Sequence, residues 1–366
     1  MRRLLAVVGD ATDRRAWSGI PHHLLRAARP TGFLQGGLAL RPGALRGRRA
    51  LWNLGTLLRT GRYGGYQYSP GFLSALMAQA GPLEDVELLS HFPLLVPPGA
   101  DQPVSYYIDA TLHQNFTDYG FGKHLPRTVM ESALRREREN YHRATHVVCM
   151  SRWAAESVRS AYGIGPGKVH VVRAGANLDE ERLRSLTLPD PPSRDVLRLG
   201  FVGKDWRRKG LLMLLEVAEE LERSGQNTRV VAIGAERDQL PAHPLLEAVG
   251  FLDKERDLDR FVSTVGATHF GCLLSSAEAL GISTLEFLRL GVPVVGLAVG
   301  GIPDCITPDD GILLPGRAEP RQVAQALLDA WDPAEYQRLR GGALARAPEV
   351  TWAETVRKLS VIWGPA

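Results

Sequence analysis

The chain has 366 residues, 44% of them hydrophobic and 23% charged, with a net charge of +4. This length is too great for one compact core and predicts two domains. No apolar run reaches the roughly 18 residues that a membrane-spanning helix requires, and the N-terminal run is too short for a signal peptide. Cys149, Cys272 and Cys305 are far apart in the sequence, which excludes a disulfide framework and predicts packed thiols in a reducing cytoplasm.

Positive charge is concentrated in the N-terminal part of the chain. Residues 1–62 contain twelve arginines and two acidic residues. Within them, Arg46, Arg48 and Arg49 lead into a leucine-rich stretch with one tryptophan at 51–58. This stretch is either a helix of the first domain with a solvated face, or a contact for an anionic acceptor or the inner face of a membrane. Nucleic acid is not an expected partner, because zinc-finger spacing, RNA-binding aromatic motifs and a lysine-rich arm do not accompany the charge.

The first half of the chain begins as an alternating α/β pattern. Residues 3–8 have the length and hydrophobicity of a strand, and the turn at 10–21 leads into a helix. Ser18 and Gly19 open this helix, and a serine-glycine turn there is a candidate site for an anion or a sugar. Since glycine after a first strand is common in α/β folds, this turn alone is weak evidence for a ligand.

Two further strands of the first half are predicted at 86–95 and 104–108. The second strand ends at Asp109, and His113 follows four residues later. Because ligands of parallel sheets lie beyond the carboxyl ends of the strands, both residues are candidates to contact a reacting sugar. A capping or turn role fits each of them as well.

The first half continues up to a proline-rich segment. A helix at 127–145 carries alternating charges from Arg135 to Glu139, which predicts a solvated face. A strand, a helix with Ser151 as its N-cap, and a strand come next. Their ranges are 146–150, 151–161 and 169–172. Residues 186–196 are rich in proline and polar side chains, which predicts a linker between the domains.

The second half restarts the pattern with a strand at 197–202 and a basic turn at 203–210. Lys204, Arg208 and Lys209 lie in this turn, beyond the carboxyl end of the strand. Three cations beside a helix N-terminus can hold a diphosphate; a basic turn without a ligand is the alternative. The remaining predicted helices and strands are at 211–223, 229–233, 249–252, 257–265 and 268–274.

Residues 275–301 form the unit around which the second half is organised: a polar turn, a short helix from about Ile282 and a buried strand. Glu278 lies in the turn and Glu286 lies one turn into the helix. The helix N-terminus stabilises an anion, and Gly281 lets a phosphate approach the backbone. A glutamate on each side of an anion site indicates a nucleotide ligand that has a sugar-like group at both ends. Two solvated acids near the start of a helix would give the same spacing.

The sequence predicts no metal site. The string Asp257-Leu258-Asp259 has the D-x-D form of a metal ligand pair, but we interpret it as the acidic first turn of the helix at 257–265. Histidine and cysteine do not cluster with metal-ligand spacing.

Several of these segments together resemble the retaining glycosyltransferases of family 4, which have the two-domain GT-B fold. The matching segments are 201–210, the pair Glu278 and Glu286 with seven residues between them, 291–295 and 300–301, with weaker matches at 17–19, 106–111 and 151–153. The resemblance implies an α/β protein with two Rossmann-like domains, which bind the acceptor (1–185) and the nucleotide sugar (197–349). The linker at 186–196 would join them, and residues 350–366 would form a helix that crosses back to the first domain.

The resemblance also implies roles for individual residues. Lys204, Arg208 and Lys209 would hold the diphosphate, Glu278 the donor sugar and Glu286 the ribose. The other donor contacts would come from Gly19, Gly281, Ile282 and Ser283. The catalytic candidates are Glu278, Asp109 and Lys209, and the candidates for acceptor or sugar contact are Ser18 and His113.

Two residues depart from the family pattern. Lys204 stands where many members have an arginine, and a lysine cannot make the bidentate contact with a diphosphate that an arginine makes. Asp109 stands where members often have a histidine, with His113 four residues later. The residue that contacts the reacting sugar is therefore either of these two.

The resemblance implies that a hexose-type sugar passes from a nucleotide-diphosphate sugar to a glycan or lipid-linked acceptor, in bacterial polysaccharide or glycolipid synthesis. The donor would be a co-substrate, and no metal or other cofactor is expected. We expect retention without a covalent enzyme intermediate, with closure of the domains excluding water. Two alternatives are a non-catalytic nucleotide-sugar-binding subunit of a polymer-synthesis complex and a GT-B hydrolase or epimerase. The presence of Glu278, Glu286 and Lys209 favours the enzyme over the binding subunit.

Overall fold

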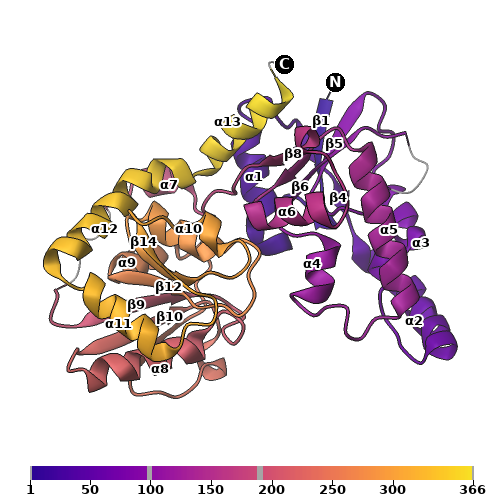
Figure 1. The fold of residues 1–366 in the computed structure, drawn as a ribbon. Coiled ribbons are helices and arrows are strands. Elements are labelled where there is room, and N and C mark those ends of the chain that lie inside the picture. The colour runs from indigo at the N-terminus through magenta and orange to yellow at the C-terminus, as the bar shows by residue number, and fades with distance from the viewer. Residues whose placement is uncertain (1, 97–100, 188–192, 365–366) are drawn as a thin grey trace. The chain divides into compact units, whose positions relative to one another are not determined.

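The structure is a computed structural model that describes residues 2–96, 101–187 and 193–364. The chain divides into two compact units, each an α/β body in Figure 1. Unit 1 comprises residues 1–173 and 355–366, and unit 2 comprises residues 174–354. Each unit is built on its own six-stranded sheet.

The sheet of unit 1 is formed by β1 (Arg2–Ala6), β3 (Gly36–Gly37), β5 (Val86–Ser90), β6 (Val104–Ile108), β7 (Val147–Cys149) and β8 (Val169–Val171). Its order is β3-β1-β5-β6-β7-β8, and all of its pairings are parallel. An antiparallel pair joins β2 (Gly9–Asp10) to β4 (Ala39–Leu40). The predicted strands are confirmed, except that the one at 86–95 ends at Ser90, where Phe92 N donates to Ser90 Oγ and the chain turns.

The α-helices of unit 1, besides the C-terminal one, are α1 (Ile20–Ala28), α2 (Arg46–Thr60), α3 (Pro70–Met77), α4 (Leu112–Thr117), α5 (Arg127–Arg143) and α6 (Arg152–Ser160). Short 3-10 helices lie at Ala16–Gly19, Pro42–Leu45, Tyr66–Tyr68 and Pro166–Lys168. The predicted cap of α6 is confirmed, since Ser151 Oγ accepts a hydrogen bond of 3.1 Å from Ala154 N. None of the helices in the described ranges is long and apolar enough to cross a membrane.

The charged face of α5 corrects a prediction. The alternating charges predict a solvated face, but Arg136 is 6% exposed and Glu137 is fully buried. Arg136 donates to the carbonyl of Tyr68, and Glu137 accepts from the hydroxyls of Tyr141 and Tyr162. Charge alternation along one helix does not reveal partners such as Tyr68 and Tyr162, which come from other segments and offset part of the cost of burying these two charges.

The sheet of unit 2 is formed by β9 (Leu197–Val202), β10 (Thr228–Ile233), β11 (Leu246–Gly250), β12 (Phe270–Leu273), β13 (Val294–Leu297) and β14 (Gly311–Leu314). Its order is β11-β10-β9-β12-β13-β14, with every pairing parallel. Two sheets of this kind, one in each unit, confirm the predicted α/β class with two Rossmann-like domains. The strand predicted at 249–252 begins earlier, at Leu246.

The α-helices of unit 2 are α7 (Glu180–Arg184), α8 (Leu211–Arg223), α9 (Leu258–Gly266), α10 (Ile282–Arg289), α11 (Pro320–Ala330) and α12 (Pro333–Arg346). Its 3-10 helices lie at Arg237–Gln239, Ile302–Asp304 and Ala347–Val350. Helix α8 has the predicted bounds, and the leucines of its predicted apolar face are buried in the core of this unit. Amphipathic periodicity thus identifies both the helix and the face that packs on the sheet.

The C-terminal helix α13 (Trp352–Trp363) crosses back to unit 1, as predicted. Residues from Thr355 onward belong to unit 1, where Thr355 Oγ1 donates to Arg173 O at 2.9 Å. At its other end, Trp363 Nε1 donates to the Glu87 carboxylate at 3.0 Å. The end of the chain is therefore anchored on the strand β5 of the first unit.

Residues 174–185 group with unit 2, whereas the sequence analysis assigns them to the first domain. Two ion pairs hold this segment: Glu180 to Arg289 at 2.6 Å and Arg182 to Asp259 at 3.2 Å. The linker at 186–196 remains a prediction, because residues 188–192 lie outside the described residues.

Candidate functional site

The candidate site of unit 2 lies where the strand order of the sheet reverses. The chain passes from β9 outward to β10 and β11, returns to β12 on the other side of β9, and continues to β13 and β14. The loops at 203–210 and 274–281 therefore leave neighbouring strands at a topological switch point, where open parallel sheets bind ligands. A hydrogen bond of 3.0 Å from Ser276 N to Arg208 O joins the two loops.

Glu278 is paired with two cations of the basic turn. Its Oε2 lies 3.3 Å from Arg208 Nη1 and 3.4 Å from Lys209 Nζ, and its side chain is 11% exposed. Arg208 also donates to Ala277 O at 2.5 Å and pairs with Asp205 at 2.9 Å. The structure thus brings together three of the predicted site residues within one unit.

The loop that carries Glu278 requires Gly300. A Cβ at this position would lie 1.8 Å from the carbonyl oxygen of Glu278, and the φ of +55° is one that L side chains rarely adopt. Gly301 N donates to the same oxygen at 3.1 Å. The Gly300-Gly301 pair, which the sequence analysis identifies only by resemblance, therefore has a structural role in seating the Glu278 loop.

The N-terminus of α10 follows this loop directly. Gly281 is its N-cap, with a φ of +89°, and no side chain caps the helix. The first N–H groups of a helix have no intrahelical partner and carry the positive end of the helix dipole, so the backbone at Ile282 and Ser283 suits a phosphate. Ser283 Oγ is buried without a hydrogen-bond partner among the described residues, which leaves it available to a ligand oxygen.

Glu286 forms an ion pair with a residue that the sequence analysis did not identify. Glu286 is 2% exposed, and its Oε1 contacts Lys254 Nζ. The same ammonium lies 4.7 Å from the ring centre of Phe261. The signal for Lys254 is its position: it follows β11, whose carboxyl end lies on the same edge of the sheet as those of β9 and β12.

Lys204 does not join the ion pairs of Glu278. Its ammonium lies 4.6 Å from the ring centre of Phe251, which is 41% exposed. Lys204 and Phe251 follow β9 and β11, so this cation–π pair lies on the same edge of the sheet as Lys254. Contact of Lys204 with a diphosphate stays a prediction.

In unit 1, Ser18 and Gly19 lie in a strained turn before α1. Trp17, Ser18 and Gly19 have φ values of 49°, 57° and 86°, a region that is costly for the two residues with side chains. Trp17 holds the turn in place: its Nε1 donates to Val8 O at 3.0 Å, and its ring packs edge-on against His91 at 5.1 Å. Because Val8 and His91 follow β1 and β5, the turn lies at the switch point of this sheet.

Asp109 and His113 lie on either side of the N-cap of α4. Asp109 follows β6 and is half-buried, and Thr111 caps the helix by accepting a hydrogen bond of 3.2 Å from Gln114 N. His113 has an exposed side chain on the first turn of α4, and its backbone N donates to the Tyr162 hydroxyl at 3.0 Å. The two side chains are therefore carried by different parts of unit 1, a strand end and a helix.

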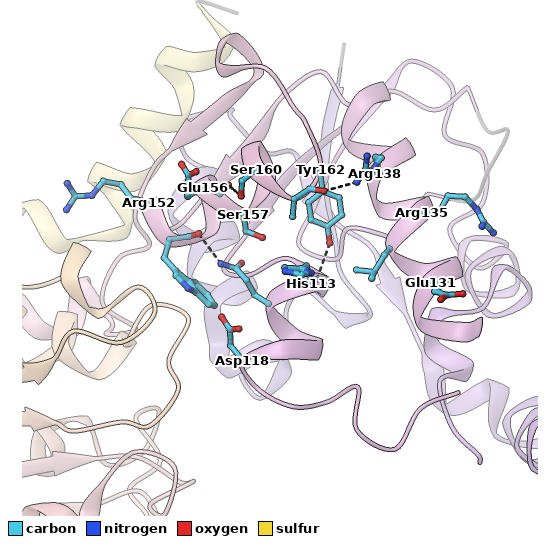
Figure 2. A pocket seen from close by; sticks show the side chains of 14 residues that line it. His113, Asp118, Glu131, Arg135, Arg138, Arg152, Glu156, Ser157, Ser160 and Tyr162 are labelled. Atoms are coloured by element: carbon cyan, nitrogen blue, oxygen red, sulfur yellow. Dashed lines mark hydrogen bonds between the residues drawn. The ribbon is translucent and has the colours of Figure 1, made fainter. Parts of the chain in front are cut away.

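His113 lines an open pocket with a volume of about 1110 Å³ between α4, α5 and α6. Figure 2 shows His113 beside Tyr162, with Arg138 and Arg135 along α5 and Arg152 on α6. Three acidic side chains, those of Asp118, Glu131 and Glu156, line the pocket as well, so its lining carries both signs of charge. The sequence analysis missed this pocket, because its charged side chains come from different helices and those of α5 were expected to form a solvated face.

Glu137 lies beneath this pocket and fixes α4 to α5. Its carboxylate accepts hydrogen bonds from Leu112 N at 2.9 Å, from Tyr141 Oη at 2.7 Å and from the Tyr162 hydroxyl. Burial raises the pKa of Glu137 to about 7, although these three donors oppose the shift. This carboxyl positions the helix that carries His113 and does not itself face a ligand.

No group of three or more His, Cys, Asp or Glu side chains that could hold a metal ion is found in the described ranges. The acids of the D-x-D string have structural partners: Asp257 Oδ2 accepts from Asp253 N at 3.0 Å, and Asp259 pairs with Arg182. These contacts agree with the interpretation of the string as part of a helix start.

Comparison with protein families gives two matches that cover different halves of the chain. The model described as "Glycosyl transferases group 1" matches residues 197–332. The model described as "Glycosyltransferase Family 4" matches residues 38–180. The two matches fall on the regions that the sequence analysis assigns to the nucleotide-sugar and acceptor domains.

Curated relatives and solved structures agree with these matches. The chain is 29% identical over 248 residues to D-inositol 3-phosphate glycosyltransferase 1 of Catenulispora acidiphila, covering 61% of this chain and 58% of that protein. It is 30% identical to 2-deoxystreptamine N-acetyl-D-glucosaminyltransferase of Streptomyces fradiae, covering 55% of this chain and 51% of that protein. The chain thus spans little more than half the length of these relatives. Sucrose-phosphate synthase of Thermosynechococcus elongatus has a similar fold, with a TM-score of 0.69 at 14% identity over 99% of this chain and 98% of that one.

Proposed function

Since the chain belongs to glycosyltransferase family 4, we propose that it transfers a hexose-type sugar from a nucleotide-diphosphate sugar to a glycan or lipid-linked acceptor. Its two parallel Rossmann-like sheets and crossing C-terminal helix constitute the GT-B fold that the sequence predicts. The observation that carries the proposal is the cluster of Glu278, Lys209 and Arg208 beside the uncapped N-terminus of α10.

Unit 2 binds the donor in this proposal. Lys209, Arg208 and the backbone at Gly281 to Ser283 hold the diphosphate, and the buried Ser283 hydroxyl supplies a further contact. Glu286 accepts hydrogen bonds from the ribose hydroxyls, with Lys254 fixing its carboxylate. Glu278 faces the donor sugar. Lys204, whose ammonium lies over the Phe251 ring, adds a further cation at this edge of the sheet.

The same groups suit the charges that develop during transfer. The bond between the anomeric carbon and the diphosphate breaks, positive charge builds on the sugar ring, and negative charge builds on the leaving phosphate. Lys209, Arg208 and the helix N-terminus stabilise that leaving group. The acceptor oxygen bonds to the anomeric carbon on the same face, and its proton passes to the departing phosphate, so configuration is retained. Glu278 orients the sugar throughout.

Unit 1 binds the acceptor. The switch-point turn offers Ser18 to the acceptor, while Gly19 beside it is a donor contact, and the pocket beside His113 has a lining of mixed charge. Asp109 contacts the reacting sugar from the end of β6. One relative uses D-inositol 3-phosphate according to its name, and the arginines among the mixed charges of this pocket could contact a phosphate group of such an acceptor. Phosphorylated polyols and lipid-linked phosphates therefore belong among the acceptors to test.

The reaction is placed in the cytoplasm, at or near the inner face of a membrane when the acceptor is lipid-linked. Cys149, Cys272 and Cys305 are buried and form no disulfide, as suits a reducing compartment. The basic N-terminal segment is attracted to an anionic membrane surface.

The test is a nucleotide-release assay with UDP-, GDP- and ADP-sugars, each with and without a pool of glycan, lipid-linked and polyol-phosphate acceptors. We expect release that requires one donor together with an acceptor, and a fall of at least about a hundredfold in Glu278→Ala. Glu216→Ala, at an exposed position on α8, is the matched control. Donor binding without turnover across the panel would favour a binding subunit, and release without acceptor would favour a hydrolase.

A further inference from the structure

Helix α2 exposes a stripe of leucines. Leu51, Leu54 and Leu58 are 73%, 56% and 78% exposed, and no residue of α2 is buried. Their spacing of three and four residues places them on one face of the helix, which we call the α2 leucine stripe. Figure 1 shows α2 at the outer edge of unit 1.

The opposite side of α2 packs on unit 1. Trp52 Nε1 donates to Gly64 O at 3.0 Å, and the Trp52 ring lies 5.9 Å from that of Tyr66. Thr56 lies one turn further on this side and is partly buried. At about 100° per residue, the midpoint of Trp52 and Thr56 falls nearly opposite the leucine stripe. The stripe therefore faces away from the domain core, whereas the apolar face of an ordinary surface helix packs against the core.

Arginines flank the stripe. Arg46, Arg48, Arg49 and Arg59 are exposed, and none of them forms an ion pair within the described residues. The sequence from residue 14 to residue 83 contains no aspartate or glutamate. The stripe thus lies in a region of unbalanced positive charge.

The surface continues beyond the end of α2. Tyr63 and Phe121 are 65% and 58% exposed. Arg62 links the two segments that carry them, since its Nη1 donates to Leu125 O at 3.2 Å. Lys123, also exposed, adds a further cation. Aromatic rings and long basic side chains around a leucine stripe are typical of a helix that lies in a membrane interface.

We propose that α2 docks unit 1 on an anionic lipid bilayer, with the leucine stripe in the acyl boundary and the flanking arginines on the lipid phosphates. The charges favour an anionic bilayer as the partner of α2. The stripe is apolar, contains no acidic residue and is bordered by arginines without ion pairs in the described part of the chain. These features complement a bilayer, which has an apolar interior and a negatively charged surface. This interaction deepens the membrane location given in the proposed function and rests on it to that extent, but it can be tested without transfer, because none of these residues is among the proposed donor or acceptor contacts.

The test is flotation of the full chain with vesicles of phosphatidylcholine alone or mixed with phosphatidylglycerol. We expect binding to the anionic vesicles, at least about tenfold weaker binding to the neutral ones, and loss of binding at high salt. The triple variant L51N/L54N/L58N and the double variant R48Q/R59Q should each bind at least about tenfold more weakly. The control is L212N/R321Q, which changes one exposed leucine and one exposed arginine of unit 2.

Other outcomes would overturn the proposal. Equal binding to neutral and anionic vesicles, or no binding to either, would exclude the charge-complementary bilayer. A wild-type dimer in light scattering that the leucine variant converts to a monomer would assign the stripe to a second copy. Thermal unfolding of each variant separates these results from misfolding, and donor release with a water-soluble acceptor should remain unchanged, so failure here is distinguishable from failure of the proposed function.

Discussion

The ion pair of Lys254 with Glu286 leads to a prediction at the scale of single residues. Glu286 is 2% exposed, so replacing Lys254 by methionine leaves a buried carboxylate without its partner. We expect Lys254→Met to destabilise the protein by about 2 kcal/mol, less than for a fully buried pair because Lys254 is 31% exposed. Donor KM should rise about tenfold with little change in kcat, because in the proposed function the pair holds the ribose and not the reacting carbon.

The double variant Lys254→Met/Glu286→Gln provides the control for this pair. Because it removes both charges, its loss of stability in urea unfolding should be smaller than the sum of the two single losses. Donor affinity, measured by calorimetric titration, should be no weaker in the double variant than in Glu286→Gln alone. Additive losses would show that Lys254 acts independently of Glu286.

At the same scale, sequence reasoning found Glu278 together with its partners Arg208 and Lys209, but it missed Lys254, the partner of Glu286. Glu278, Gly281 and Glu286 belong to one strand-turn-helix segment, so spacing alone indicates their shared edge. Lys254 enters the site from a different strand, and its pairing depends on the sheet order. A single sequence does not specify that order.

The buried carboxyl of Glu137 gives a prediction at the scale of elements, since it joins α4 to α5. Its pKa in the folded protein is about 7, above the ordinary value of 4.5. The raised pKa means that the protonated form is favoured in the fold, so this contribution to stability is complete below pH 4.5 and is lost as pH rises through about 7. The loss amounts to about 3 kcal/mol by linkage.

Glu137→Gln removes this titration. We expect the difference in unfolding free energy between pH 5 and pH 8 to be smaller in the variant than in the wild type. The protection factor of the Leu112 amide, which donates to Glu137, should fall with rising pH more in the wild type than in the variant, once exchange rates are divided by the intrinsic rate at each pH. An identical pH profile in both proteins would contradict the assignment.

Elements were predictable where one face is apolar and buried, as α8 illustrates. The same periodicity identifies α2, but it does not tell which face the rest of the protein covers. In α5, Glu137 and Arg136 were assigned to solvent because their partners, Tyr162 and Tyr68, lie in distant segments. Local pattern therefore predicts that an element exists, whereas its orientation depends on contacts that are remote in sequence.

At the scale of the whole molecule, the repeated α/β pattern predicts two domains, and the crossing of α13 follows from resemblance alone. The segment 174–185 is the exception: the sequence analysis ends the first domain at the proline-rich linker, whereas these residues group with unit 2. Its membership of unit 2 comes from ion pairs with Arg289 and Asp259, more than 70 residues further along. Such long-range pairs leave no local signal.

The anchor of α13 gives the last prediction. Trp363 donates to Glu87, packs against His146 at 4.7 Å and lies 4.9 Å from the guanidinium carbon of Arg3. Trp363→Ala should cost about 2 kcal/mol of stability in unit 1, because the ring is only partly buried. All the unit 2 residues assigned to the donor diphosphate and ribose lie outside this anchor, so nucleotide affinity in calorimetric titration should not change.

In the proposed function transfer uses groups of both units, and α13 is one of the two chain segments that connect them, so transfer should respond differently. Loosening its end gives unit 1 more freedom relative to unit 2, so fewer encounters place an acceptor against the bound donor. We expect kcat to fall about tenfold in Trp363→Ala and to stay unchanged in Val361→Ala, a control whose side chain is 72% exposed. A parallel loss of nucleotide affinity would instead mean that the helix contributes directly to the donor site, and that the division of labour between the two units is wrong.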